Sequence, residues 1–269
     1  MNRSRVTREL VRRVVPGNKW AMANRKFISL RTVGRAVIDY ALPPRCAGCG
    51  EVIVDVGAFC PPCWGNMDWL GNEGCQRCGL PLVGTEADTC ARCLADPPKL
   101  DRIRAAVAYD ELPRSIALRL KYGRKVGLAR TMARYMAPLK GAWDDDALLI
   151  PVPLHRWRLW GRGFNQSILV ARELARSWHL PAEHGVLRRT KRTQPLKGLS
   201  HQQRRKAVSG AFHVADGNIL AGKTVVLVDD VLTSGSTAEA CARALRQAGA
   251  ARVELICWAR VVRPTQLMR

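Results

Sequence analysis

Four pairs of cysteines between residues 46 and 93 constrain the fold of this chain more than any other feature. Each pair has the spacing C-x-x-C, and the pairs are separated by 10, 11 and 11 residues. A C-x-x-C turn presents two thiolates to one metal ion, and two such turns complete a tetrahedral zinc site. The sequence therefore predicts about two zinc ions per chain, held by Cys46, Cys49, Cys60, Cys63, Cys75, Cys78, Cys90 and Cys93.

The order of the pairs favours two consecutive zinc ribbons. Gly50 and Gly79 follow the first and third pairs, where a glycine relieves the tight turn beneath the metal. We therefore assign the first two pairs to one zinc and the last two to the other. A cross-braced arrangement, first pair with third and second with fourth, is the alternative. Disulfides would need an oxidising compartment, and iron–sulfur clusters usually have other spacings.

The basic charge of the chain is unevenly distributed. The formal net charge is +22, of which residues 1–45 carry +9, residues 46–100 carry −4, residues 101–150 carry +4 and residues 151–269 carry +13. One acidic segment thus lies within a strongly basic protein. The basic segments indicate polyanionic partners, either the phosphates of a small ligand or a nucleic-acid backbone. A chain that uses arginine for solubility would have the same charge.

Composition excludes a mainly disordered chain, because 47% of the residues are hydrophobic and 25% are charged. The longest apolar runs are far shorter than the roughly 18 to 20 residues that span a bilayer. The arginine-rich N-terminus has no apolar core of a secretory signal, and Met22 is an alternative start. We therefore expect a cytoplasmic protein without a membrane span.

A second motif, T-V-V-L-V-D-D-V-L-T-S-G-S-T, occupies residues 224–237. Its apolar run at 225–228 predicts a parallel strand covered on both faces, ending at Asp229 and Asp230. Backbone N–H groups at the start of the following helix can hold a phosphate. The two carboxylates can accept hydrogen bonds from vicinal hydroxyls at the end of the strand. A ribose 5-phosphate therefore fits Asp229, Asp230, Thr233, Ser234, Gly235, Ser236 and Thr237.

A different phosphate motif overlaps this region and is rejected. Residues 217–224 match G-x-x-x-x-G-K-[ST], but a P-loop must follow a strand and open a helix. Here the pattern leads into the strand, so we interpret it as a turn. Cys241 and Cys257 stand alone in apolar patterns and are expected to be buried.

Residues 225–237 resemble the phosphoribosyl-pyrophosphate (PRPP) motif of type I phosphoribosyltransferases. Residues 151–156, 162–166, 191–196 and 210–212 are similar to the signature of the ComF family, also called the GntX or competence protein F family. The resemblance covers about residues 42–260. It implies an α/β fold, with a type I phosphoribosyltransferase-like parallel sheet flanked by helices and preceded by a small N-terminal double zinc-ribbon module.

The expected domain limits follow from this resemblance. They are a basic extension with a short helix at 1–41, the double zinc ribbon at 42–96, the phosphoribosyltransferase-like domain at 101–262 and a tail at 263–269. The loop T-S-G-S-T departs from the usual T-T-G-A-T, yet it keeps small hydroxyl residues. Asn2 stands where glutamine amidophosphoribosyltransferases have a catalytic cysteine, so the chain should not be that enzyme.

The resemblance also implies how PRPP and Mg²⁺ would be bound. His155, Arg156 and Arg162 would handle pyrophosphate from an exposed loop at 153–164, and a basic surface loop without this role is the alternative. The polar segment 191–207 could form a lid over pyrophosphate or a surface that contacts nucleic acid. Arg192, Gln194 and Arg204 are the flexible-loop candidates for catalysis. We identify no general base, and the sequence does not indicate the acceptor.

Two functions are compatible with these features. The first is a phosphoribosyltransferase that transfers phosphoribosyl to an unidentified nitrogen acceptor or acts in DNA uptake and competence. The alternative is a non-catalytic protein that handles single-stranded DNA, with a vestigial PRPP site and with ribbons that bind proteins of the competence machinery. Trp157 and Trp160 lie in a basic segment and could stack on bases.

Overall fold

The computed structural model describes residues 43–82, 87–143, 145–191 and 200–262. The expected segments 1–41 and 263–269, with their helix and Met22, lie outside the described residues, as do Arg192 and Gln194. The elements, in chain order, are α2 (Pro61–Gly65), α3 (Ala91–Ala95), β1 (Arg102–Ala108), α4 (Glu111–Tyr122), α5 (Leu128–Met136), η1 (Ala137–Leu139), β2 (Leu148–Pro151), α6 (Arg156–Arg162), α7 (Gln166–Trp178), β3 (Leu187–Arg189), α8 (His201–Ala207), β4 (Phe212–Val214), η2 (Asn218–Leu220), β5 (Thr224–Leu232), α9 (Ser236–Gln247) and β6 (Arg252–Arg260).

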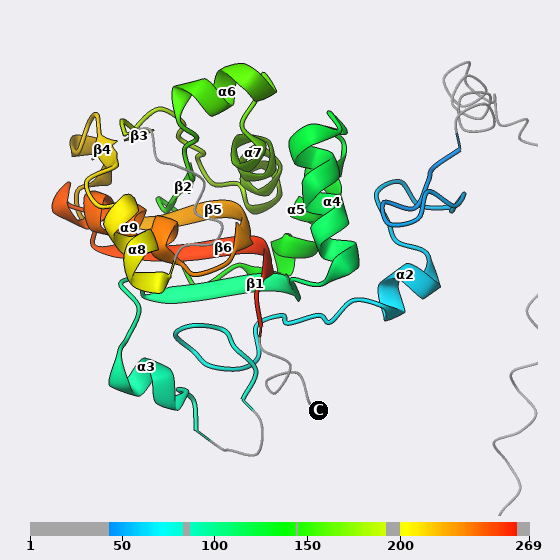
Figure 1. Ribbon diagram of the computed structural model, residues 1–269, viewed down its shortest axis with the longest axis horizontal. Coiled ribbons are helices and arrows are strands. Elements are labelled where there is room, and N and C mark those ends of the chain that lie inside the picture. The colour runs from blue at the N-terminus through cyan, green and yellow to red at the C-terminus, as the bar shows by residue number, and fades with distance from the viewer. Residues whose placement is uncertain (1–42, 83–86, 144, 192–199, 263–269) are drawn as a thin grey trace, which may run out of the picture. The chain divides into compact units, whose positions relative to one another are not determined.

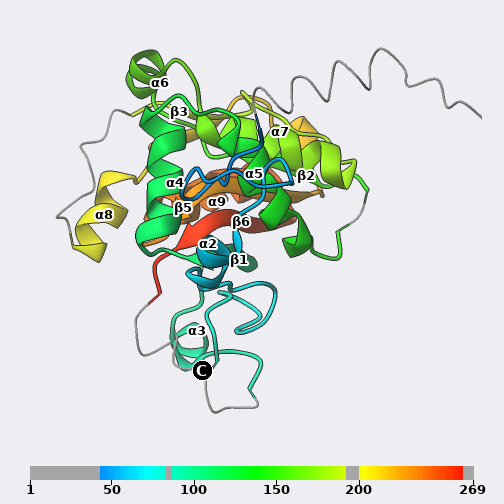
Figure 2. The same ribbon diagram turned by 90° about the vertical axis from the view of Figure 1, so that its right-hand side faces the viewer.

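A parallel sheet with the strand order β1-β6-β5-β2 forms the centre of the fold (Figure 1). Val226 and Val228 of β5 face a core formed with α4, α5 and α7, whereas Val225 and Leu227 face a second core formed with α9. This division follows from the alternation of side chains along a strand. Figure 2 shows the same sheet between its helices from the side. The predicted parallel α/β sheet with flanking helices is confirmed.

Strand β5 is longer than predicted. It continues to Leu232, so Asp229 and Asp230 lie inside the strand and not after its end. The reason is the neighbouring strand, since β6 extends to Arg260 and pairs Asp229 with Cys257 and Leu232 with Arg260. The acidic pair is consequently fixed by the sheet itself.

The segment expected to be an exposed loop at 153–164 contains helix α6, so this prediction is wrong. His155 is buried and begins the helix, with its Nδ1 atom accepting a hydrogen bond from the Trp157 N–H at 3.5 Å. Gly163, at φ +79°, ends it. Histidine is not among the residues that usually mark a helix start, so the sequence pattern did not reveal this helix.

Two smaller predictions are confirmed. The P-loop-like segment 217–224 forms the short turn η2 and then enters β5, so it does not open a helix. Cys241 and Cys257 are fully buried, one in α9 and the other in β6. Among the described residues, no helix is both long enough and apolar enough to cross a membrane.

Candidate functional site

The eight paired cysteines form two separate clusters of four. One cluster contains Cys46, Cys49, Cys60 and Cys63, and the other contains Cys75, Cys78, Cys90 and Cys93. Within each cluster the sulfur atoms all lie within 4.8 Å of one another. The consecutive pairing is therefore confirmed, and the cross-braced alternative is wrong.

The distances within the clusters fit zinc. Four thiolates about 2.3 Å from a tetrahedral ion lie about 3.8 Å from one another. The Sγ atoms of Cys49 and Cys60 are 3.6 Å apart, and those of Cys78 and Cys90 are 3.8 Å apart. Each site thus has the ligand number, ligand type and spacing of a structural zinc centre.

Backbone N–H groups support thiolates in both clusters. Cys46 Sγ accepts hydrogen bonds from the N–H groups of Gly48 and Cys60, each at 3.3 Å. Cys75 Sγ accepts one from the Cys90 N–H at 3.3 Å. Burial acts to raise the pKa values of Cys46 and Cys75, but backbone hydrogen bonds outweigh it and lower each pKa to about 6. These hydrogen bonds favour the metal-binding form of both side chains.

The first ribbon packs against the face of the sheet that α4, α5 and α7 cover. Phe59 lies 5.0 Å from the ring centre of Tyr135 in α5 and 6.3 Å from that of Trp258 in β6. The guanidinium of Arg119 in α4 donates to the Ala47 carbonyl at 2.5 Å. An aromatic cluster and one arginine therefore join this ribbon to the main core.

Two buried arginines hold the second ribbon, and the sequence analysis did not identify either. Arg104 of β1 donates to the carbonyls of Cys75 and Gln76, at 3.3 and 3.0 Å. Arg260, the last residue of β6, donates to the Cys78 carbonyl. The contact is close, because a Cβ atom at Gly79 would lie 2.4 Å from the Ile103 carbonyl oxygen. The second zinc turn is thereby fixed to the edge of the sheet.

The acidic pair lies in the interior strand β5, where Asp230 is buried and Asp229 is half-buried. Asp229 Oδ1 accepts hydrogen bonds from the Ser167 hydroxyl at 3.2 Å and from the Asp230 N–H at 2.9 Å. Burial, and next the charge of Asp230, raises the pKa of Asp229 to about 7, against the opposing effect of Lys121. Such perturbed carboxylates are typical of functional sites.

Lys121 is a cation of this site that sequence reasoning missed. It lies in the last turn of α4, and its Nζ atom is 2.7 Å from Asp230 Oδ2. Both side chains are largely buried, with 19% and 4% of their surface exposed. Burial acts to lower the pKa of Lys121, but the charge of Asp230 raises it overall. No motif around Lys121 connects it to the distant strand β5, so the sequence carried no signal for this pair.

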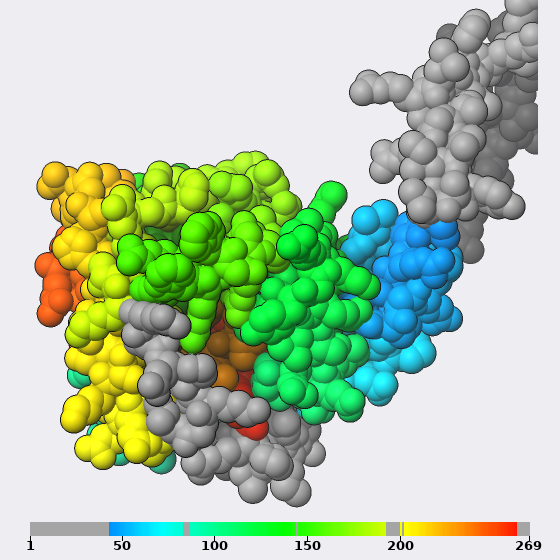
Figure 3. Space-filling model, turned by 45° about the horizontal axis from the view of Figure 1, so that its top comes forward, coloured from blue at the N-terminus to red at the C-terminus, as the bar shows by residue number. Residues whose placement is uncertain are grey.

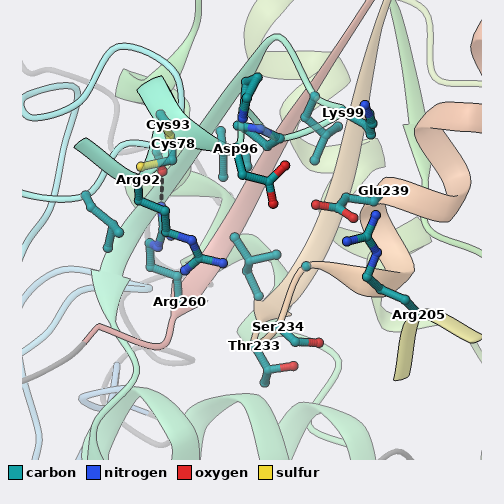
Figure 4. Close-up of a pocket in the computed structure, with 17 residues that line it drawn as sticks. Cys78, Arg92, Cys93, Asp96, Lys99, Arg205, Thr233, Ser234, Glu239 and Arg260 are labelled. Atoms are coloured by element: carbon teal, nitrogen blue, oxygen red, sulfur yellow. Dashed lines mark hydrogen bonds between the residues drawn. The ribbon is translucent and has the colours of Figure 1, made fainter. Parts of the chain in front are cut away.

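The expected loop of small residues follows β5 and leads directly into helix α9. Gly235 adopts φ +78°, a left-handed conformation that favours glycine, and directly precedes the twelve-residue helix α9. The hydroxyl oxygens of Ser234 and Ser236 lie 3.1 Å apart. Thr233 and Ser234 also line a cavity that Arg92 and Cys93 of the second ribbon, Arg205 of α8 and Arg260 share (Figure 4).

Arg162 contacts side chains of α4 and α7, whereas the His155 and Arg156 side chains contact Trp157 of α6. The Arg162 guanidinium donates to Gln166 Oε1 at 3.2 Å and to the Tyr122 hydroxyl at 3.1 Å. It therefore lies beside the Lys121–Asp230 pair. His155 is buried as the first cap of α6, and the Arg156 guanidinium lies over the Trp157 ring. Of the three flexible-loop candidates, only Arg204 is described, and it belongs to α8.

Helices α4 and α7 lie on one side of the acidic pair and contact it through Lys121 and Ser167. Figure 3 shows the ends of β5 and β6, in orange and red, at the bottom of a hollow beside the green atoms of α4 and of the α6–α7 region. The carboxyl ends of parallel strands and the start of α9 meet there, and α/β proteins bind ligands at such places. The two carboxylates, Lys121 and the start of α9 therefore occur together near the carboxyl end of β5.

Comparison with known proteins agrees with this geometry. A family model described as a double zinc ribbon domain matches residues 37–94, and one described as a phosphoribosyl transferase domain matches residues 165–266. Competence protein F of Haemophilus influenzae is 34% identical over 218 residues, which are 73% of this chain and 94% of that protein. The chain belongs to the ComF family.

Other ComF-family relatives have lower identity. The DNA utilization protein YhgH of Escherichia coli is 32% identical over 194 residues, covering 70% of this chain and 84% of that protein. Competence protein ComFC of Bacillus subtilis is 24% identical over 201 residues, covering 71% and 79%.

Among solved structures, glutamine PRPP amidotransferase from Bacillus subtilis aligns at 25% identity with a TM-score of 0.32. That alignment covers 48% of this chain and 26% of the amidotransferase, so this chain spans about a quarter of its length.

Proposed function

We propose that this ComF-family protein binds PRPP together with Mg²⁺ and transfers its phosphoribosyl group to a nitrogen acceptor. The observation that carries this proposal is the order along the chain of a half-buried Asp229, a buried Asp230, a left-handed Gly235 and the start of α9. The 5-phosphate would lie on residues 233–237, where backbone N–H groups and hydroxyls can hold an anion. The ribose hydroxyls would donate to Asp229 and Asp230.

In this reaction the bond from C1 of the ribose to pyrophosphate breaks, and a bond from C1 to the nitrogen forms. The nitrogen loses its proton to solvent, and pyrophosphate leaves with its electron pair. Asp229 and Asp230 orient the ribose and do not transfer a proton. Arg162, with Arg192, Gln194 and Arg204 of the proposed lid, would stabilise the charge of the leaving pyrophosphate. Mg²⁺ would neutralise phosphate charge when bound.

Calorimetry tests the binding step. Asp229→Asn combined with Asp230→Asn should weaken the binding of PRPP with Mg²⁺ by at least about ten- to a hundredfold, because the loss of even one charged hydrogen bond costs about 1.5 to 3 kcal/mol. Asp146→Asn, which changes an exposed carboxylate, is the matched control. Unchanged affinity in the double variant would overturn the ligand assignment. Release of pyrophosphate with a panel of nitrogen acceptors would then test transfer.

A second candidate function is the handling of single-stranded DNA in the cytoplasm, together with proteins of the competence machinery. Residues 151–269 carry a net charge of +13, and relatives of this chain are named for competence and for DNA utilization. Under this proposal the ribbons bind protein partners, and the PRPP site is vestigial. Loss of PRPP binding without any effect on DNA uptake in cells would favour it over phosphoribosyl transfer.

A further inference from the structure

Helix α6 has no buried residue, although three of its seven residues are large and apolar. Trp157 is 49% exposed, Leu159 is 42% exposed and Trp160 is 81% exposed. Figure 1 shows α6 at the top of the molecule, beyond α7 and the sheet. These side chains therefore contribute little to the core, and their exposure needs another explanation.

Both ends of α6 are nevertheless fixed to the protein. His155 is buried at its start. Past its end, Asn165 is buried, and its side-chain amide donates to the Val152 carbonyl at 3.0 Å. The last residue of the helix, Arg162, donates to Gln166 and Tyr122. The helix is thus held in place while its aromatic side chains face solvent.

The exposed rings lie among arginines. The ring centres of Trp157 and Trp160 are 5.8 Å apart with an interplanar angle of 56°, and the Arg156 guanidinium lies 5.7 Å from the Trp157 ring centre. A shallow groove runs over this surface, lined by Arg156, Trp157, Leu159, Trp160 and Gly163. Cations and aromatic faces therefore occur together in one groove.

The positive charge of α6 is not neutralised within the described residues. Arg156, Arg158 and Arg162 form no ion pair with a carboxylate there, and the helix contains no acidic residue. Further basic charge lies close by, since burial and then the charge of Arg158 lower the pKa of Arg189 in β3. Such a concentration of charge attracts a polyanion.

We propose that α6 is a stacking platform for single-stranded nucleic acid, with bases on Trp157 and Trp160 and a phosphate at Arg156. Proteins that bind single strands combine a basic groove with aromatic side chains on which bases stack. Paired bases are not available for this contact, so the platform discriminates against duplexes. The inference rests on the second proposed function and specifies its binding surface.

The arrangement of α6 favours a nucleic acid over a lipid surface. A helix that lies in a membrane interface separates its apolar and charged residues onto opposite faces. In α6 the helical spacing places Arg158 and Arg162 on the side away from the rings, but Arg156 lies on the same side as Trp157 and Trp160, and its guanidinium covers one of the rings. The groove that the rings line therefore contains a cation, which suits a phosphate beside a stacked base.

The test uses the full-length, zinc-loaded protein and a fluorescent 20-nucleotide oligothymidine, with a duplex of equal length as competitor. Trp157→Leu with Trp160→Leu keeps apolar side chains but removes the rings, and we expect it to bind the single strand at least tenfold more weakly. Trp157→Phe with Trp160→Phe keeps the rings and should stay within about threefold of the parent. Zinc content and circular dichroism should be unchanged in all variants.

A second measurement locates the contact. Ultraviolet cross-linking to an oligonucleotide that contains 5-iodouracil should place the cross-link in residues 156–162. Equal affinity of the leucine and phenylalanine variants, or cross-links confined to other segments, would overturn the platform while leaving DNA binding intact. A parent protein that does not bind the oligonucleotide would overturn DNA binding itself. Binding of phosphatidylglycerol vesicles that depends on Trp157 and Trp160, without oligonucleotide binding, would assign the surface to lipid.

Discussion

The Nζ atom of Lys121 lies 2.7 Å from Oδ2 of Asp230, so the last turn of α4 supplies the counter-charge to a carboxylate of β5. The two residues are 109 positions apart in the chain. Tyr122, the next residue, contacts Arg162. One turn of α4 therefore connects the acidic pair with the segment that carries α6, and α4 belongs to the candidate site.

Replacing Lys121 should reveal the free-energy cost of burying the Asp230 carboxylate without a counter-charge. Lys121→Met leaves a buried carboxylate without its partner, and we expect the free energy of unfolding to fall by about 3 to 5 kcal/mol at pH 8. Adding Asp230→Asn removes the unpaired charge and should restore much of that loss. Urea unfolding of the parent and the three variants measures the coupling. Additive effects of the two substitutions would contradict a direct ion pair.

Asp229 should make both stability and ligand binding depend on pH. Its pKa in the folded protein is about 7, above the ordinary value of about 3.9. Between these values the folded chain holds more protons than the unfolded chain, so this group makes stability fall as pH rises from about 4 to 7. Asp229→Asn keeps an oxygen for Ser167 and should remove this contribution, which urea unfolding across that pH range would reveal.

The same proton should be released when PRPP binds. Hydroxyl donors favour the ionised form of Asp229, so below pH 7 we expect affinity to increase with pH and binding to release up to one proton. Calorimetry in buffers with different ionisation enthalpies measures this number. A proton count of zero at pH 6 would show that Asp229 does not change its charge on binding.

Zinc analysis should find about two ions per chain. Because the clusters are separate, Cys46→Ser should remove the first ion and leave the second, whereas Cys75→Ser should have the reverse effect. Mass spectrometry of the native protein distinguishes one retained ion from none. Loss of both ions from either substitution would mean that the two ribbons fold as one unit.

The arginines that hold each ribbon allow a matched comparison. Arg104→Met removes the donor to Cys75 and Gln76, so the second ion should be released to a chelator faster. Arg119→Met removes the donor to Ala47 in the first ribbon and should accelerate release of the first ion only. Each unsatisfied carbonyl costs about 1 to 3 kcal/mol, which predicts roughly five- to a hundredfold faster release. If both variants released both zinc ions at the same rate, the arginine contacts would not stabilise the two ribbons separately.

The local parts of the fold could be predicted because their signals lie close together in the sequence. The C-x-x-C spacing indicated the two zinc ribbons, and the apolar run before Asp229 indicated a buried parallel strand. Helix α6 was missed because its cap is a histidine and its residues bury no apolar face. Periodicity can indicate a helix only where one side of it packs against a core.

By itself the sequence determined the zinc ligands, the parallel α/β sheet and the loop that opens α9. Local sequence governs all three, through the spacing of the metal ligands, the apolar run of a strand covered on both faces within a family motif, and the conformational freedom of Gly235. Only the tertiary structure decided that Lys121 neutralises Asp230 and that Arg104 and Arg260 hold the second ribbon. These contacts join residues 28 to 182 positions apart. No local pattern encodes them, because a buried charge or carbonyl takes whichever partner the packed sheet and helices bring within reach.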